Sequence, residues 1–207
     1  MQIDLSVKKR DQKALEKKEG GKDEGSFDNF PQITRKSVQL LEERGFKGLL
    51  PIQSSTFDVI FGGRDLIARD LTGSGKTLGF ALPIVEHMRK EKLFGREHPR
   101  AVMLAPTREL AVQVRLNSLE ITAELEKLKH HTDEYQVLTV YGGVPIDAQI
   151  HRLSKGVDIF VGTTGRVLDH LNRGTLSLKS LQTIVLDEAD QMLKLGFKED
   201  IEKVSCF

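Results

Sequence analysis

The chain has 207 residues, a formal net charge of +1, 39% hydrophobic residues, 29% charged residues and one cysteine. This is the composition of an ordinary globular protein, and the small net charge argues against a strongly polybasic nucleic-acid binder while leaving room for a local basic groove. The sequence contains no apolar run near the roughly 20 residues of a membrane span, no apolar amino-terminal signal and no second cysteine for a disulfide, so we expect an intracellular protein that does not enter a membrane.

The first 26 residues form the first segment in chain order. They mix lysine, arginine, aspartate and glutamate with glycine and have few large apolar side chains. Such a segment cannot bury enough apolar surface to offset the entropy lost on ordering. We expect residues 1–26 to be a charged flexible tail, with a transient partner-binding helix around Leu5, Ala14 and Leu15 as the alternative.

From Phe27 onward, short apolar runs alternate with helical segments, so residues 27–207 are expected to form one domain. Near-continuous apolar strands that alternate with helices indicate an α/β fold with a parallel sheet covered on both faces. Amphipathic stretches such as Glu109–Leu128 fill the intervals. The expected strands are Asp65–Ala68, Ala101–Ala105, Gln136–Val140, Asp158–Gly162 and Thr183–Leu186.

A glycine-rich run lies between the apolar stretch Asp65–Ala68 and a helix-like stretch, Leu78–Met88. In a strand–loop–helix setting, glycines let backbone N–H groups approach phosphate oxygens, a lysine can bridge the β- and γ-phosphates, and a hydroxyl can ligate Mg²⁺. Lys76 and Thr77 are the residues for these last two roles, and a purely structural salt bridge is the alternative for Lys76. The candidate phosphate-binding residues are Thr72, Gly73, Ser74, Gly75, Lys76 and Thr77.

A pair of carboxylates follows the very apolar run Thr183–Leu186. Because this run reads as a buried strand, Asp187 and Glu188 should emerge at the carboxyl edge of the sheet, where open α/β folds bind ligands. Asp187 would hold Mg²⁺ through water and Glu188 would polarise the attacking water. Acidic residues are also favoured at helix starts, so a helix cap is the alternative. The predicted catalytic residues are Lys76, Asp187 and Glu188.

These stretches, with others in order along the chain, resemble the motifs of the DEAD-box RNA helicases of superfamily 2. The resemblance covers the chain from about Phe27 to its end and implies a RecA-like fold of the P-loop NTPase type, with a mostly parallel sheet sandwiched between helices. Two segments, Phe27–Pro31 and Asp190–Leu193, look most like the nucleolar Gu subgroup. The further matching residues are Gly45 and Phe46, Pro51 to Gln53, Pro106 to Leu110, Gly142 and Gly143, and Thr163 to Arg166.

The resemblance assigns adenine recognition to Gln53 and Phe27. The glutamine amide offers one donor and one acceptor at the spacing of the adenine edge, and the aromatic ring would stack on the base. The alternative for Gln53 is a polar residue at a helix start, and the alternative for Phe27 is a core aromatic. ATP with Mg²⁺ is the implied cofactor.

Four residues, at three places in the chain, depart from the family pattern. Leu49 and Leu50 stand where the family usually has Pro-Thr, which alters the turn. Thr164 replaces the usual proline, which makes its loop less rigid. Asp70 occupies the place of a small residue at the start of the phosphate loop, where a carboxylate turned inward would repel a triphosphate. We therefore hypothesise weakened nucleotide affinity.

The resemblance also implies RNA contacts from the other loops at the sheet edge. Helix starts after strands offer free N–H groups to phosphates, Arg108 and Arg166 could add phosphate contacts, and glycines would let the sugar–phosphate chain approach. Such contacts read the backbone rather than the base sequence. An internal salt bridge is the alternative for each arginine. The candidate RNA-binding residues are Pro106, Thr107, Arg108, Gly142, Gly143, Thr163, Gly165 and Arg166.

In the family, Asp190 links the nucleotide site to a Ser-Ala-Thr motif on a further strand, and a second RecA-like domain supplies arginines to the γ-phosphate. Val204–Phe207 does not match that strand, so we expect a C-terminally truncated first domain, monomeric and inactive in unwinding alone. Three functions stay open. They are the ATP-binding part of an RNA-dependent ATPase and helicase of the nucleus or nucleolus, a nucleotide- and RNA-binding module without turnover, and a protein-interaction adaptor with a degenerate phosphate loop.

Overall fold

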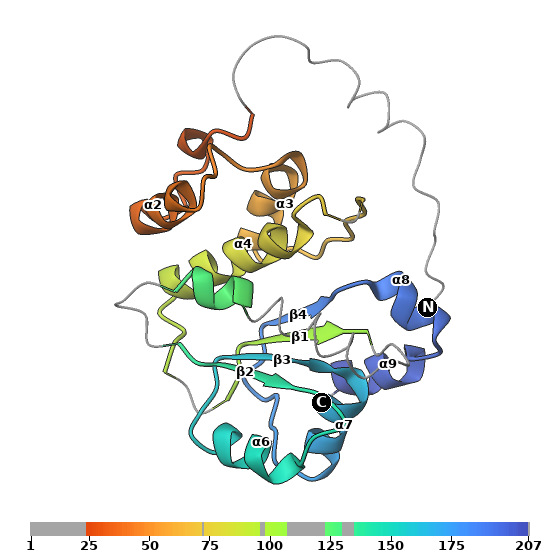
Figure 1. Cartoon of the computed structure of the whole chain (residues 1–207). Coiled ribbons are helices and arrows are strands. Elements are labelled where there is room, and N and C mark those ends of the chain that lie inside the picture. The colour runs from red at the N-terminus through yellow and green to blue at the C-terminus, as the bar shows by residue number, and fades with distance from the viewer. Residues whose placement is uncertain (1–23, 72, 96–97, 107–122, 130–134, 207) are drawn as a thin grey trace.

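The computed structural model in Figure 1 describes residues 24–71, 73–95, 98–106, 123–129 and 135–206. Most of the expected tail and of the expected helix Glu109–Leu128 lies outside these residues. Within them, residues 123–127 are helical, which agrees with the end of that expected helix.

A parallel sheet of four strands forms the centre of the fold, in the order β2-β3-β1-β4. The expectation of a parallel sheet is confirmed, and the four later strands are confirmed to within about one residue at each end. The strands are β1 (Ala101–Ala105), β2 (Val137–Val140), β3 (Ile159–Thr163) and β4 (Thr183–Leu186).

Alternation along the strands divides the apolar side chains between two cores. In β1, Met103 belongs to one core, whereas Val102 and Leu104 belong to the other. The same division separates Val161 from Phe160 in β3. Because successive side chains of a strand point to opposite faces, a strand that is apolar at every position requires cover on both sides.

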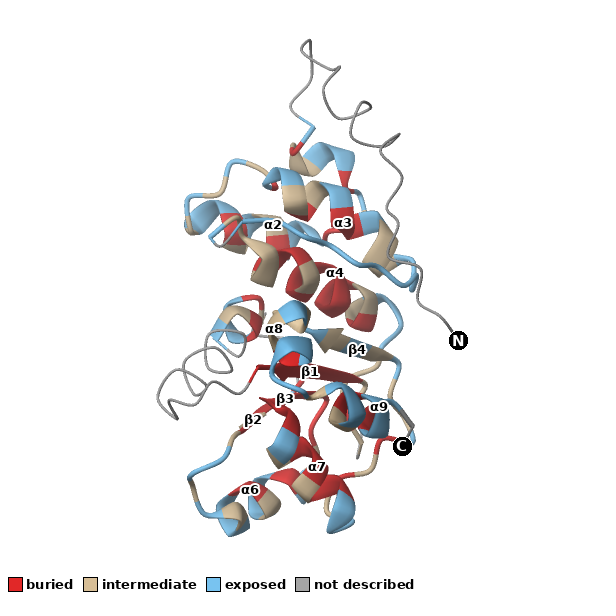
Figure 2. Ribbon diagram, turned by 90° about the vertical axis from the view of Figure 1, so that its right-hand side faces the viewer, coloured by how far each residue is buried: buried red, intermediate tan, exposed pale blue. Residues whose placement is uncertain are grey.

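Helices supply this cover, so the sheet is sandwiched as expected (Figures 1 and 2). The helices α2, α3 and α4 lie over one face, and α6, α7 and α9 lie over the other. No helix in the described ranges is long and apolar enough to cross a membrane. The helical elements are η1 (Phe27–Asn29), α2 (Arg35–Glu43), α3 (Pro51–Phe61), α4 (Lys76–Lys90), α6 (Ile146–Leu153), α7 (Thr164–Asn172), α8 (Ala189–Lys194) and α9 (Lys198–Cys206).

The strand expected at Asp65–Ala68 is wrong. Residues 64–71 form an irregular exposed segment, in which Ile67 is 94% exposed. Just after the expected strand, the Asp70 carboxylate accepts from Leu71 N–H, and the Lys76 ammonium donates to the Asp70 and Leu71 carbonyls. A strand needs a neighbouring strand to pair with, and an apolar run does not specify one.

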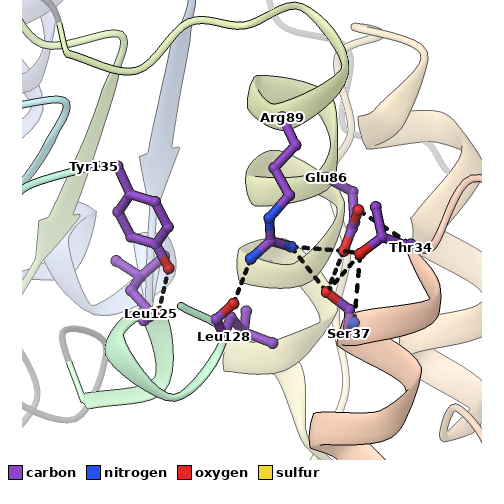
Figure 3. Close-up of polar contacts among 7 residues, drawn as sticks. All are labelled: Thr34, Ser37, Glu86, Arg89, Leu125, Leu128 and Tyr135. Atoms are coloured by element: carbon purple, nitrogen blue, oxygen red, sulfur yellow. Dashed lines mark hydrogen bonds and ion pairs between the residues drawn. The ribbon is translucent and has the colours of Figure 1, made fainter. Parts of the chain in front are cut away.

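A buried ion pair within α4, Glu86 with Arg89, is hydrogen-bonded to the start of α2 (Figure 3). The Glu86 carboxylate, on a residue only 1% exposed, accepts from the Arg89 guanidinium at 2.7 Å and from the Thr34 backbone N–H at 3.2 Å. Arg89 also donates to the Ser37 hydroxyl at 2.8 Å and to the Leu128 carbonyl. One arginine therefore links α4 to α2 and to the helical segment 123–127.

Removing Arg89 should strongly destabilise the fold, because it leaves the Glu86 carboxylate buried without its cation. We expect Arg89→Met to lower the free energy of unfolding by about 3–5 kcal/mol, measured by urea denaturation. Arg173→Met, at the exposed Arg173–Asp169 pair, is the matched control and should change stability little. Equal losses in the two variants would contradict a special role for the buried pair.

Candidate nucleotide and RNA site

The phosphate loop leads into the amino terminus of α4. Gly75 caps this helix with φ +86°, and Gly73 has φ +83°, both in the left-handed region that glycine adopts at little cost. Figure 1 shows α4 beginning on the side toward which the strands point. The unpaired N–H groups and positive dipole end of a helix start favour an anion there.

The Lys76 ammonium bonds to its own loop. It donates to the Asp70 carbonyl at 2.9 Å and to the Leu71 carbonyl at 2.6 Å. Thr77 lies half-buried in the first turn of α4, and Thr72 lies outside the described residues. The lysine is thus folded over the glycine-rich run, where a phosphate would compete with two carbonyl oxygens for it.

Gln53 connects this loop to the start of α3. Its side chain is buried, its Nε2 donates to the Gly75 carbonyl at 3.0 Å, and its Oε1 accepts from Leu50 N–H at 2.9 Å. The second bond satisfies a backbone group at the start of the helix, as in a capping box. This geometry is that of a polar residue at a helix start, which was the alternative expected for Gln53. Adenine recognition by Gln53 stays a prediction.

Phe27 lies in η1, half-buried and packed against the core that contains α3 and α4. A backbone bond from Leu49 N–H to the Gly25 carbonyl, 2.7 Å long, ties this segment to the residues just before α3. A Cβ at Gly25 would lie 2.1 Å from the Leu49 carbonyl oxygen, so only glycine allows this approach. Stacking of Phe27 on a base remains a prediction.

The acidic pair follows β4, at the edge where all four strands end. Asp187 N–H donates to the Leu104 carbonyl of β1 at 2.9 Å, and the Asp187 carboxylate accepts from Glu188 N–H at 3.1 Å. Glu188 caps α8 with φ +50°, a left-handed conformation that is costly for a non-glycine residue. Asp190 is exposed and pairs with Lys194 at 3.4 Å.

The expectation that Asp187 and Thr77 hold Mg²⁺ together with a nucleotide stays a prediction. Among the described residues, no group of three or more histidine, cysteine, aspartate or glutamate side chains could hold a metal ion. Mg²⁺ does not require such a cage, because it is usually held by one or two carboxylates, waters and substrate phosphates. The Asp187 carboxylate and the Thr77 hydroxyl have the oxygen chemistry for that role.

Asp70 is exposed, and its carboxylate accepts from Leu71 N–H at 2.8 Å. Its charge lies within the same short loop whose carbonyls hold the Lys76 ammonium. The effect of this charge on nucleotide binding remains a hypothesis.

The candidate RNA residues occupy the ends of the other strands. Pro106 is buried directly after β1, whereas Thr107 and Arg108 lie outside the described residues. Thr163 ends β3 and caps α7, as expected. Gly165 is exposed in the first turn of α7.

The contacts of Thr164 and Arg166 differ from those expected from the sequence. Thr164, expected to loosen its loop, is buried and donates to the Met192 sulfur of α8 at 3.7 Å. Arg166 bonds to the Val144 carbonyl and to Gln149 Oε1, each at 3.1 Å, rather than to a carboxylate. Sequence reasoning did not select Gln149, because a single glutamine in a short amphipathic helix gives no signal of its partners.

The glycine turn after β2 is open. Gly143 has φ +79°, and a Cβ built on either Gly142 or Gly143 would meet no atom within 4 Å. The turn therefore leaves room for a ligand beside its backbone.

Comparisons with known proteins identify relatives that match most of the chain. A family model described as DEAD/DEAH box helicase matches residues 50–207. The chain is 45% identical over 186 residues to nucleolar RNA helicase 2 of Rattus norvegicus, which covers 88% of this chain and 22% of that protein. It is 44% identical over 183 residues to ATP-dependent RNA helicase DDX50 of Homo sapiens, which covers 87% of this chain and 23% of that protein.

A solved structure is also similar to this chain in both fold and sequence. The crystal structure of a DEAD box protein from the hyperthermophile Methanococcus jannaschii matches with a TM-score of 0.71 and 36% identity, over 85% of this chain and 45% of that chain. The chain spans less than a quarter of the length of the two curated relatives named above.

Gly75 is the loop position at which a side chain should do most harm. A Cβ there would lie 2.4 Å from Gln53 Nε2 and would have to adopt φ +86°. We expect Gly75→Ala to lose at least about 1–2 kcal/mol of folding free energy from the left-handed backbone alone, measured by urea denaturation. Gly142→Ala, which meets open space, is the control, and equal stability of the two variants would contradict the geometry.

Proposed function

Because the chain belongs to the DEAD/DEAH box helicase family, as its motifs predicted, we propose that it is the ATP-binding RecA-like part of an ATP-dependent RNA helicase. In this proposal, it binds ATP with Mg²⁺ and the RNA backbone. Hydrolysis would drive unwinding or remodelling of RNA duplexes in a longer protein that also carries a second RecA-like domain. The nucleolar relatives favour a nucleolar location.

The observation that carries the proposal is the glycine-rich helix start of α4 with its lysine, together with an acidic pair at the end of a strand. When a nucleotide binds, Lys76 would exchange the Asp70 and Leu71 carbonyls for β- and γ-phosphate oxygens. Bound Mg²⁺ would neutralise phosphate charge, and the residues to hold it are Thr77 and Asp187. Glu188 would orient and polarise the attacking water.

Gln53 can serve the loop and the base together. An amide side chain has two N–H donors and two acceptor lone pairs, and the bonds to Gly75 and Leu50 use one of each. In the proposal, the remaining donor and acceptor would pair with the adenine edge, and the buried side chain would become accessible when the base binds. The proposal therefore couples base recognition to the conformation of the phosphate loop, with Phe27 stacking on the base.

Asp70 favours a second candidate, a nucleotide- and RNA-binding module or adaptor whose altered phosphate loop does not support turnover. A carboxylate at the start of the loop opposes a polyphosphate, and the same loop holds the Lys76 ammonium through its carbonyls. Nucleotide binding separates an adaptor from the other functions.

Calorimetric titration of ADP with Mg²⁺ into the chain tests the main proposal. We expect saturable binding that weakens at least about tenfold in Lys76→Ala, because a charge-assisted hydrogen bond to phosphate is lost. Lys198→Ala, on the exposed pair with Glu202, is the control and should bind as the parent does. No binding to the parent would refute a working phosphate loop and favour the adaptor.

Asp70→Ala should bind ADP with Mg²⁺ a few times more tightly than the parent, because a like charge is removed from the loop. The effect should be modest, because Asp70 is exposed and its charge is screened. Asp70→Asn, which keeps the size and removes the charge, separates repulsion from crowding. Affinities equal to that of the parent in both variants would refute the hypothesis of weakened binding in the same titration.

A further inference from the structure

The Gly142–Gly143 turn after β2 is hydrogen-bonded on both sides by side chains of α6 and α7. Before the turn, the Tyr141 carbonyl accepts from Gln149 Nε2 at 3.2 Å. After it, the Val144 carbonyl accepts from both terminal nitrogens of Arg166, each at 3.1 Å. Gln149 and Arg166 come from α6 and α7, which lie side by side in both views of the molecule.

These two side chains are also bonded to each other. Arg166 donates to Gln149 Oε1 at 3.1 Å, so the amide that holds one end of the turn is oriented by the guanidinium that holds the other. A guanidinium has five N–H donors, and these bonds leave donors for a phosphate. Arg166 is thus oriented from the protein side and remains able to contact RNA.

His170 fixes the orientation of that amide. The ring is fully buried, with Nε2 3.1 Å from Gln149 Oε1 and Nδ1 2.9 Å from the Thr175 hydroxyl. Because Gln149 Nε2 is used on Tyr141, Gln149 Oε1 is the acceptor and His170 Nε2 must carry the proton. In a neutral ring Nδ1 is then an acceptor for the Thr175 hydroxyl, whose single proton is shared with the His170 carbonyl at 3.1 Å.

A neutral ring meets this requirement. Burial lowers the pKa of His170, and the positive charge of Arg166 lowers it further, which outweighs the opposing effect of Asp169. A neutral imidazole has one N–H and one acceptor nitrogen, and both are used here. In that neutral ring, Nε2 supplies the N–H that Gln149 Oε1 accepts.

From these contacts we propose that His170 and Gln149 are positioning residues for RNA binding, which act through Arg166 to hold the Gly142–Gly143 turn in its ligand-ready conformation. Among the described residues, a Cβ built on Gly142 or Gly143 would meet no atom within 4 Å, so packing at these two positions does not fix the turn. The turn is instead held by the bonds from Gln149 to the Tyr141 carbonyl and from Arg166 to the Val144 carbonyl. This inference rests on the proposed binding of RNA by the chain.

Two substitutions at His170 separate hydrogen bonding from packing. His170→Phe keeps an aromatic ring, including its edge contact with Phe160, and removes the N–H donor. His170→Gln removes the ring and can keep an N–H directed at Gln149 Oε1. If the bond matters, the glutamine variant should resemble the parent and the phenylalanine variant should not.

The first readout is binding of a fluorescently labelled single-stranded oligouridine RNA at fixed salt, followed by anisotropy. We expect His170→Phe to bind about three- to tenfold more weakly, the range expected for one lost hydrogen bond, and His170→Gln to stay within about twofold of the parent. Equal affinity of all three proteins would overturn the proposal. So would a glutamine variant as weak as the phenylalanine variant, because packing would then explain the effect.

The second readout is amide hydrogen exchange at residues 141–145, with β1 and β3 as internal references. Faster exchange at the turn alone in His170→Phe, restored in His170→Gln, supports the positioning role. Unchanged exchange at the turn overturns it. If the parent binds no RNA, the proposed function fails for this chain, and the exchange result still decides whether the network holds the turn.

Discussion

Parallel pairing of β1 with both β3 and β4 is the constraint from which the rest of the structure follows. Each residue of β1 is buried, and alternate side chains enter the two cores. A strand of this kind is stable only when helices cover both faces. Parallel strands also all end at the same edge, so the loops that follow them are brought together there by topology rather than by their own sequences.

Buried polar groups then set the details on each side of the sheet. On one side, Glu86 and Arg89 of α4 bond to Thr34 and Ser37 at the start of α2. On the other, Arg166, Gln149 and His170 hold a turn. In both places an arginine bonds to a backbone carbonyl as well as to a side chain, which fixes geometry more tightly than an apolar contact could.

The strands that are apolar throughout were predictable from the sequence, because burial on both faces leaves a signal in every residue. The start of α4 was predictable for a similar reason, since Gly73 and Gly75 need backbone conformations that other residues avoid. The failure at Asp65–Ala68 has a different cause. An apolar run indicates that a segment prefers to be a strand, but strand pairing depends on distant partners that the run itself does not specify.

The sequence predicted which residues belong to the site, but it did not predict the contacts that they make. Motifs selected Gln53 and Arg166, but not that one would bond to Gly75 and the other to Val144. His170 gave no signal, because a histidine among apolar residues of a helix looks the same whether it fills space or orients an amide. Such roles depend on which nitrogen faces which oxygen, and only the fold determines that.

The position of β4 gives its acidic pair a second physical effect. In the described part of the chain β4 is an edge strand, and Ile184 and Leu186 remain exposed on it. An open apolar edge invites pairing with a second copy of the chain. Two copies aligned in parallel along β4 would bring Asp187 and Glu188 of each next to their counterparts, where like charges repel. Asp187 and Glu188, which are expected to bind Mg²⁺ and to polarise a water, thus also disfavour parallel pairing of two copies along β4.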